Sequence, residues 1–188
     1  MKNYKLKIVE DASPDSPRSW DNFTTIFCFH KRYNIGDDHK YKSDMFDGWE
    51  EFKEHIIAEY KPRLIKPLYM YDHSGITIST SPFGCRFDSG QIGWVFITDE
   101  QIMKLCGNND YTDEQINNWL EGEIKTYDHY IQGDVYGYQI IETEVCDKGH
   151  IHEEVVDSCY GYFGEAEAEE AGQDALSGYT KDEVLQHT

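Results

Sequence analysis

Four residues in the C-terminal third of the chain carry side chains that could bind a metal ion. They are Cys146, His150, His152 and Cys159. Cysteine and histidine are the donors that zinc prefers in tetrahedral protein sites. The spacing Cys-x₃-His-x-His-x₆-Cys differs from the usual zinc-finger patterns, and cysteines also suit the core face of a strand. Both interpretations stay open, a zinc site or strand and turn residues, and we assign no metal.

A second group could supply nucleophilic catalysis. Cys85 and Ser89 lie in a glycine-bounded loop over residues 81–90, and His30 or His73 could act as the base. Such catalysis needs the base and an orienting acid within hydrogen-bond distance. The chain contains no Gly-x-Ser-x-Gly motif and no Gly-rich phosphate-binding loop. We therefore expect a structured loop and assign no catalytic residue.

A third group could contact nucleic acid. Cations alternate with aromatic residues over residues 30–42, a composition in which cations meet phosphates and rings stack on bases. The cations are Lys31, Arg32, Lys40 and Lys42. In a chain with a net charge of −19, ion pairs with the protein's own carboxylates are the competing interpretation.

Carboxylates dominate the charge of the protein. The chain contains 36 Asp and Glu against 17 Lys and Arg, and residues 45–188 carry a net −20. A charge of this size opposes contact with DNA, RNA or anionic membrane and steers basic partners toward the protein. Solubility alone is the alternative explanation.

Two sets of acids are the expected contact surface for a basic partner. A surface that imitates DNA needs dense charges at fixed spacing, since the duplex carries one phosphate per roughly 1.7 Å of axis. The exposed faces of capped helices and a C-terminal helix could hold carboxylates in this way. The candidate residues are Asp113, Glu114, Glu121, Glu123, Glu165, Glu167, Glu169 and Glu170.

The hydrophobic pattern predicts the elements that position these residues. Strands are expected over residues 4–9, 23–30, 68–71, 76–79, 92–97, 135–143 and 151–160. Helices are expected over residues 45–60 and after capping boxes that begin at Thr98 and Thr112. Short connections between strands indicate an α+β fold, a mainly antiparallel sheet of about five to seven strands packed with three to four helices. We expect one domain over residues 1–164 and an acidic, short and exposed C-terminal helix or tail over residues 165–188.

Hydropathy and cysteine usage predict the compartment. No apolar segment approaches the roughly 18–20 residues that span a bilayer, and the N-terminus has no run long enough for a signal peptide. The five cysteines are odd in number and include no Cys-x-x-Cys pair. We therefore expect reduced thiols and a cytoplasmic protein.

Five short motifs are distinctive. They are Ser-Pro-Arg-Ser-Trp-Asp-Asn at 16–22, Phe-His-Lys-Arg-Tyr-Asn-Ile-Gly-Asp at 29–37, Asp-Ser-Gly-Gln-Ile-Gly at 88–93, Gly-Asp-Val-Tyr-Gly-Tyr at 133–138 and Asp-Ser-Cys-Tyr-Gly-Tyr-Phe-Gly at 157–164. Together they resemble a family of acidic proteins carried by phages and mobile elements of gut and other low-GC bacteria. The match spans most of residues 15–165, and the tail from Glu165 does not follow the pattern. The resemblance implies a counter-defence protein of the bacterial host cell, a type II anti-CRISPR that inhibits Cas9, and attaches no catalytic role to these motifs.

These observations favour a stoichiometric binder over an enzyme, with no cofactor. Cas9 holds its guide and target in a positively charged channel, which an acidic domain could occupy while residues 31–42 contact RNA or DNA. Two alternatives stay open. One is a small metal-dependent or hydrolytic enzyme acting on a host signal or nucleic acid, and the other is an acidic accessory protein without inhibitory role.

Overall fold

The protein has an α+β fold, as expected. A computed structural model describes residues 2–186, with side chains placed for residues 2–179. The described residues form seven strands, in two antiparallel sheets, and four α-helices. The chain divides into two compact units, Met1–Asp15 with Gly133–Thr188 (unit 1) and Ser16–Gln132 (unit 2). These limits differ from the expected boundary at residue 164, because both ends of the chain contribute strands to unit 1.

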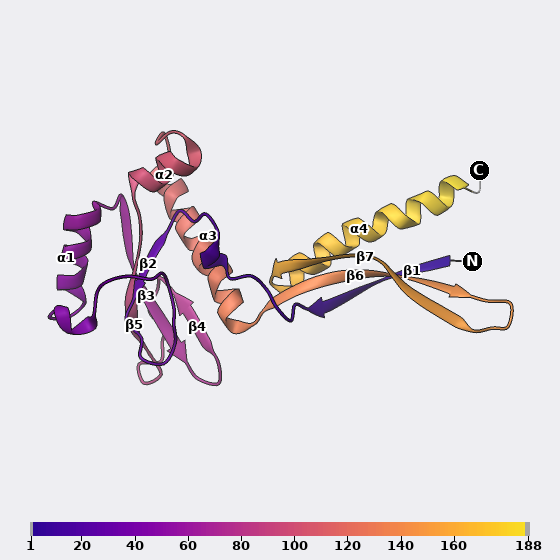
Figure 1. The fold of residues 1–188 in the computed structure, drawn as a ribbon, viewed down its shortest axis with the longest axis horizontal. Helices are drawn as coiled ribbons and strands as arrows, with labels where there is room; N and C mark the ends of the chain where they lie inside the picture. Colours follow the sequence, from indigo (N-terminus) through magenta and orange to yellow (C-terminus); the bar gives the residue numbers. More distant parts are fainter. Residues whose placement is uncertain (1, 187–188) are drawn as a thin grey trace. The chain divides into compact units, whose positions relative to one another are not determined.

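Unit 2 is a four-stranded sheet with helices on both faces (Figure 1). The strand order is β2 (Thr25–Cys28), β5 (Ser89–Ile97), β3 (Leu64–Asp72) and β4 (Ile76–Ser79). The helices are α1 (Trp49–Tyr60), α2 (Asp99–Cys106) and α3 (Asp113–Gln132), with short 3-10 turns at η1 (Pro17–Ser19) and η2 (Ser43–Met45).

Strand β5 explains why both faces of this sheet are covered. Its side chains alternate between faces: Val95 packs in the cluster that includes α2 and α3, whereas Trp94 and Phe96 pack in the cluster that includes α1. The stripe predicted for α3 is confirmed, since Ile116, Leu120, Ile124 and Tyr127 are all buried.

Both predicted capping boxes are present in unit 2. Thr98 Oγ1 accepts from the Gln101 backbone N–H at 3.2 Å, and Gln101 Oε1 accepts from the Thr98 N–H at 2.8 Å. Thr112 and Gln115 form the same reciprocal pair. At the start of each of α2 and α3, two N–H groups that lack a partner within the helix are therefore satisfied by side chains.

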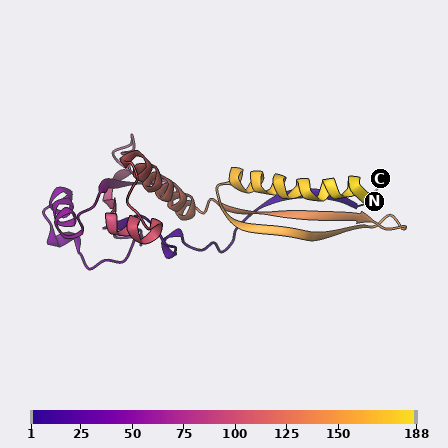
Figure 2. The ribbon, with the colours of Figure 1, turned by 90° about the horizontal axis from the view of Figure 1, so that it is seen from above.

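Unit 1 is a three-stranded sheet with one helix on one face (Figure 2). The strand order is β1 (Lys2–Glu10), β6 (Val135–Val145) and β7 (Ile151–Phe163), and α4 spans Glu165–Gln186. The expectation of a short, exposed helix was wrong in both respects. Helix α4 packs against all three strands, with Ala168 fully buried and Gly172 so close to the sheet that an added Cβ would lie 2.5 Å from Leu6 Cδ1. Among the described residues, no helix combines the length and the apolar character that crossing a bilayer requires.

Candidate functional site

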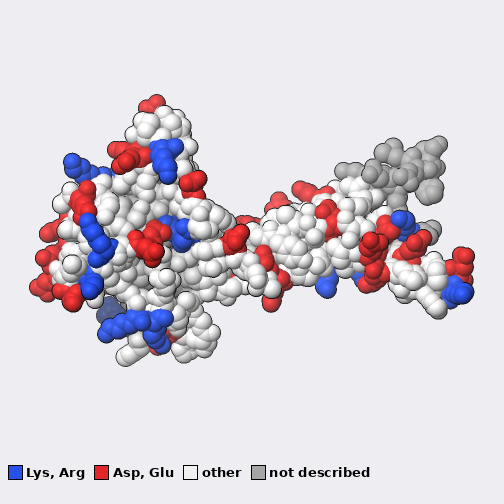
Figure 3. Space-filling view, viewed as in Figure 1, with Lys and Arg blue, Asp and Glu red and all other residues white. Residues whose placement is uncertain are grey.

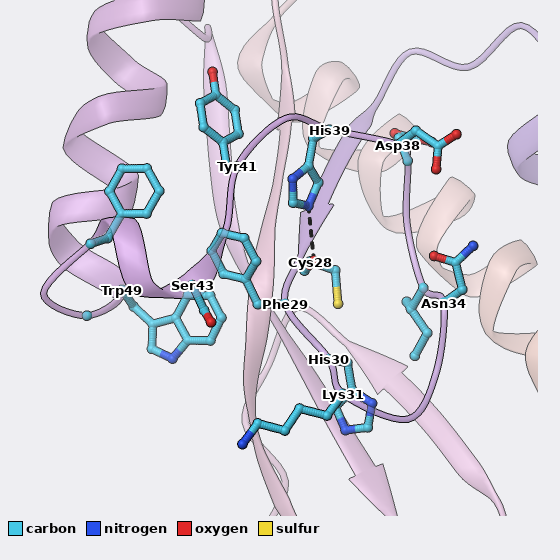
Figure 4. Close-up of a pocket in the computed structure, with 14 residues that line it drawn as sticks. Cys28, Phe29, His30, Lys31, Asn34, Asp38, His39, Tyr41, Ser43 and Trp49 are labelled. Carbon is cyan, nitrogen blue, oxygen red and sulfur yellow. Dashed lines mark hydrogen bonds between the residues drawn. The ribbon is translucent and has the colours of Figure 1, made fainter.

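The connection between β2 and α1 in unit 2 lines an open cavity of about 600 Å³. Figure 4 shows Phe29, Tyr41 and Trp49 on one side of it and Asn34 and Asp38 on the other. Cys28 and His39 lie between these two groups, and His30 and Lys31 lie at one end. The cavity thus joins aromatic rings to polar and charged side chains, and the motif at residues 29–37 supplies six of the lining residues.

A buried ion pair holds this loop to the sheet. Arg18 Nε and Nη2 donate to the two carboxylate oxygens of Asp37 at 2.9 and 2.6 Å, and the Arg18 side chain is only 9% exposed. Asp37 Oδ2 also accepts from the Ile26 N–H of β2 at 2.8 Å. A bidentate, charge-assisted contact therefore joins two of the distinctive motifs, at 16–22 and 29–37. This is among the stronger hydrogen-bond geometries in proteins.

Three further contacts fix the course of the loop. Gly36 has φ +89°, and an added Cβ would lie 2.8 Å from the Ile26 carbonyl oxygen, so this position requires glycine. The Gly36 N–H donates to Tyr127 Oη of α3 at 3.1 Å. His39 Nε2 donates to the Cys28 carbonyl oxygen at 3.0 Å, which leaves His39 Nδ1 buried without a described partner.

Burial shifts the pKa of two groups beside the cavity, the Cys28 thiol and the His30 imidazole. Burial raises the pKa of the Cys28 thiol to about 12, so it stays protonated and is a poor nucleophile. Burial, followed by the charge of Arg32, lowers the pKa of His30. His30 Nδ1 accepts the Tyr33 N–H at 3.2 Å, which makes this histidine part of a turn.

The structure divides the four predicted nucleic-acid contacts into two pairs. Arg32 forms an ion pair with Asp72, and Lys40 forms one with Glu59 at 2.9 Å. Lys31 and Lys42 are exposed and form no ion pair with any other described residue. Only Lys31 lines the cavity.

The four acids predicted on α3 are not equivalent. Asp113 is 90% exposed beside Arg63, and Glu114 is exposed. Glu121 is 41% exposed and contacts Lys66 Nζ at 2.7 Å and the Thr80 hydroxyl. Glu123 does not lie on an exposed face: it is 19% exposed and accepts the Phe23 and Thr24 backbone N–H groups at 2.7 and 3.0 Å. Glu123 is therefore an internal anchor for the segment before β2.

The predicted acids of the C-terminal helix all lie on its outer surface. Glu165, Glu167, Glu169 and Glu170 are exposed on α4, and no cation among the described side chains pairs with them. Unit 1 as a whole contains five Lys and Arg against 17 Asp and Glu, whereas unit 2 contains 12 against 19. Figure 3 shows acidic side chains along the visible face of unit 1 and alternating signs on unit 2. The excess negative charge is concentrated in unit 1.

The residues considered for nucleophilic catalysis do not form a triad. Cys85 Sγ lies 3.6 Å from Asp88 Oδ2, and His73 Nδ1 lies 3.4 Å from the same oxygen, so the acid stands between thiol and imidazole. The Ser89 hydroxyl donates to the Cys85 carbonyl oxygen within the loop. His30 lies in a different turn. These contacts describe a structured loop.

The four candidate zinc ligands are not brought together. Cys146 and His150 flank the β6–β7 turn, where the Cys146 N–H donates to the His150 carbonyl oxygen at 3.0 Å. His152 pairs with Glu144 near that turn, whereas Cys159 pairs with Tyr138 far along the strand. His152 and Cys159 lie seven positions apart along β7, a distance of roughly 23 Å in a strand. Across the described residues, no three His, Cys, Asp or Glu side chains gather closely enough to hold a metal ion.

Sequence reasoning assigned no site role to most residues that line this cavity, among them Phe29, Asn34, Asp38 and Trp49, or to Arg18, which anchors the loop. Arg18 and Asp37 lie 19 positions apart in two of the distinctive motifs, which is the one signal that could have linked them. Comparisons with known protein families, curated proteins and solved structures found no match for this chain. The resemblance to phage counter-defence proteins stays a prediction.

Proposed function

We propose that this protein is a stoichiometric inhibitor that binds the basic, nucleic-acid-handling surface of a host defence enzyme, with Cas9 as the partner to test first. The observation that carries the proposal is the set of exposed, unpaired carboxylates on α4, in the unit that holds most of the excess negative charge. Inhibition by occupation of a basic channel needs no catalytic group.

The geometry of α4 supports a regular charge array. Glu167, Glu170 and Asp174 follow spacings of three and four residues, which places them on one side of a helix. The opposite side packs on the sheet through Ala168 and Gly172. Carboxylates on a docked helix keep their spacing when a partner approaches, whereas those on a loose tail would lose conformational freedom on binding.

The first experiment titrates the protein into a Cas9–guide complex and follows DNA cleavage at low and at moderate salt. We expect inhibition that saturates near equal stoichiometry and weakens as salt screens the contact. Full cleavage at every ratio would exclude Cas9 and direct the search to other basic enzymes. Complete inhibition by a small substoichiometric amount would overturn the binding mechanism in favour of an enzyme.

A charge-matched pair of variants tests whether α4 is the contact surface. Changing Glu165, Glu167, Glu169 and Glu170 to Gln should lower the association rate constant by roughly tenfold, because long-range steering acts mainly on encounter. The control changes four exposed acids of unit 2 to their amides, Asp44, Glu54, Glu100 and Asp110. Equal effects of the two variants would show that net charge, and not α4, governs binding.

A further inference from the structure

The cavity of the β2–α1 loop offers three kinds of contact that a single ligand could use. The Phe29 and Trp49 rings line it with centroids 5.9 Å apart and planes inclined by 22°. Asn34 and Asp38 line it from the opposite side, and Lys31 lies at one end (Figure 4). Its volume of about 600 Å³ lies within the range of small-molecule sites.

Three polar side chains of this cavity lack partners among the described residues. Lys31, Asn34 and Asp38 form no side-chain hydrogen bond or ion pair with another described residue, whereas their neighbours Arg32, Asp37 and Lys40 are all paired. One free cation, one free amide and one free carboxylate thus border the same space. A ligand can therefore contact them without breaking a hydrogen bond or ion pair among the described residues.

The loop that carries them is organised before any ligand arrives. The Arg18–Asp37 pair, the Gly36 contact to Tyr127 and the His39 bond to the Cys28 carbonyl fix it at three separate points. Ile35 is buried between these contacts at 6% exposure. A loop held this way pays little ordering entropy when it binds a ligand.

We propose that this cavity binds a nucleotide. Its base stacks on the Phe29 and Trp49 side, where aromatic rings favour flat heterocycles. Its phosphate pairs with Lys31 in a charge-assisted contact. Asp38 accepts from the base edge, and since a carboxylate can take two N–H donors, guanine, which presents two adjacent donors, is the preferred base.

Other ligand classes fit these groups less well. The free Lys31 ammonium repels the arginine or lysine side chain of a partner, and a purely apolar ligand would cover Asn34 and Asp38 without satisfying them. The nucleotide is either free or an unpaired residue of single-stranded nucleic acid, since a paired base keeps its edge and its faces in the duplex. The site lies wholly in unit 2, whereas α4 belongs to unit 1. A failure of this proposal can therefore be distinguished from a failure of the proposed α4 contact.

The test is a fluorescence and calorimetric titration of the whole protein. The probes are the four ribonucleoside 5′-monophosphates, a short guanine-containing single-stranded RNA, the same RNA as a duplex, and arginine amide. We expect saturable quenching of Trp49 by the free nucleotide or the single strand, guanine strongest, and none by the duplex. If only the monophosphate binds, the ligand is a free nucleotide. If only the single strand binds, the ligand is an unpaired residue of nucleic acid. A Trp49→Phe variant should lose most of the quenching and, because the smaller ring offers less stacking surface, bind the same probe more weakly by calorimetry.

Conservative surface variants assign the binding to this cavity. Lys31→Gln should weaken the nucleotide affinity about tenfold, and Asp38→Asn should remove the preference for guanine. Lys125→Gln and Asp110→Asn repeat these charge changes at exposed positions elsewhere in unit 2 and should leave affinity unchanged. All four positions are exposed, so folding is expected to survive. Absence of saturable binding, binding that neither cavity variant alters, or saturable binding of arginine amide instead would overturn the proposal.

Discussion

At the scale of single residues, a few buried polar contacts determine where the loop motif lies. Arg18 joins η1 to Asp37, Asp37 joins the loop to β2, and Glu123 joins α3 to the segment before β2. Each contact satisfies polar groups that would otherwise be buried without partners. Leaving such a group unsatisfied costs more free energy than the hydrogen bond itself contributes. The cavity therefore depends on Arg18 and Glu123, which do not line it, as well as on Asp37, which does.

Breaking the Arg18–Asp37 pair should destabilise unit 2. We expect Arg18→Met to lower the free energy of unfolding by about 3 kcal/mol, because it leaves a largely buried carboxylate without its cation. Asp37→Asn should cost a similar amount, and the double variant should cost clearly less than the sum. Urea unfolding followed by tryptophan fluorescence measures this, because all four tryptophans lie in unit 2. Strict additivity of the two changes would contradict the pairing.

Glu59 should make part of the stability of unit 2 depend on pH. The hydrogen bond from Tyr41, followed by that from Lys40, lowers the pKa of Glu59 to about 2. A lowered pKa stabilises the folded state above the unfolded pKa, and this contribution is lost as pH falls through the folded pKa. We therefore expect the stability difference between wild type and Glu59→Gln to shrink as pH falls from about 4.5 toward 2. Urea unfolding across this range is the measurement, and a difference that does not vary with pH would argue against the assignment.

At the scale of elements, close packing of β5 against β2 places the cavity at the edge of the aromatic cluster. Gly93 pairs with Cys28, and an added Cβ at Gly93 would lie 2.2 Å from the Phe27 carbonyl oxygen. Backbone atoms cannot rotate away as a side chain does. The strand pair that begins the loop therefore requires glycine at this position.

Substitution of Gly93 should lower the stability of unit 2, whereas Gly90 of the same strand should tolerate the same change. We expect Gly93→Ala to destabilise unit 2 by about 2–4 kcal/mol, through displacement of β2. Gly90→Ala is the matched control in the same strand, because nothing lies within 4 Å of its added Cβ. Thermal unfolding of the two variants gives the comparison. Similar melting temperatures would mean that β2 and β5 can separate without penalty.

At the scale of the whole molecule, negative charge opposes compactness. The net charge is −19, and the smaller unit carries a net −12 of it. Like charges on a compact body repel one another, and dissolved salt screens that repulsion. Repulsion within the more acidic unit therefore lowers its stability, and a bound basic partner would reduce this repulsion.

The melting temperature should therefore rise with ionic strength. Between about 0.02 and 0.5 M NaCl the screening length falls from roughly 20 Å to 4 Å, so most surface repulsion is removed. We expect the rise to be smaller in the variant in which Glu165, Glu167, Glu169 and Glu170 are changed to Gln. Circular dichroism melts at several salt concentrations measure both. A melting temperature that falls with salt would show that the surface ion pairs outweigh the repulsion.

Local spacing determined most of the secondary structure. The capping residues of α2 and α3, the stripe from Ile116 to Tyr127 and the strand periodicities depend on neighbours within a few positions, and each lies where the pattern predicts. For α4, the glutamates among alanines predicted a helix that carries acidic residues, but not that its other face packs on the sheet.

Contacts between distant residues decided the rest. Glu123 accepts a backbone N–H from Phe23, 100 positions away, which turns an apparent surface acid into an internal anchor. Lys40 and Arg32 find carboxylates 19 and 40 positions along the chain, which leaves Lys31 as the unpaired cation of the cavity. The pairing of β1 with β6 likewise joins the two ends of the chain into unit 1. A linear pattern records which groups are present but not the distances between them, and those distances determine which charges are neutralised and which remain free to bind.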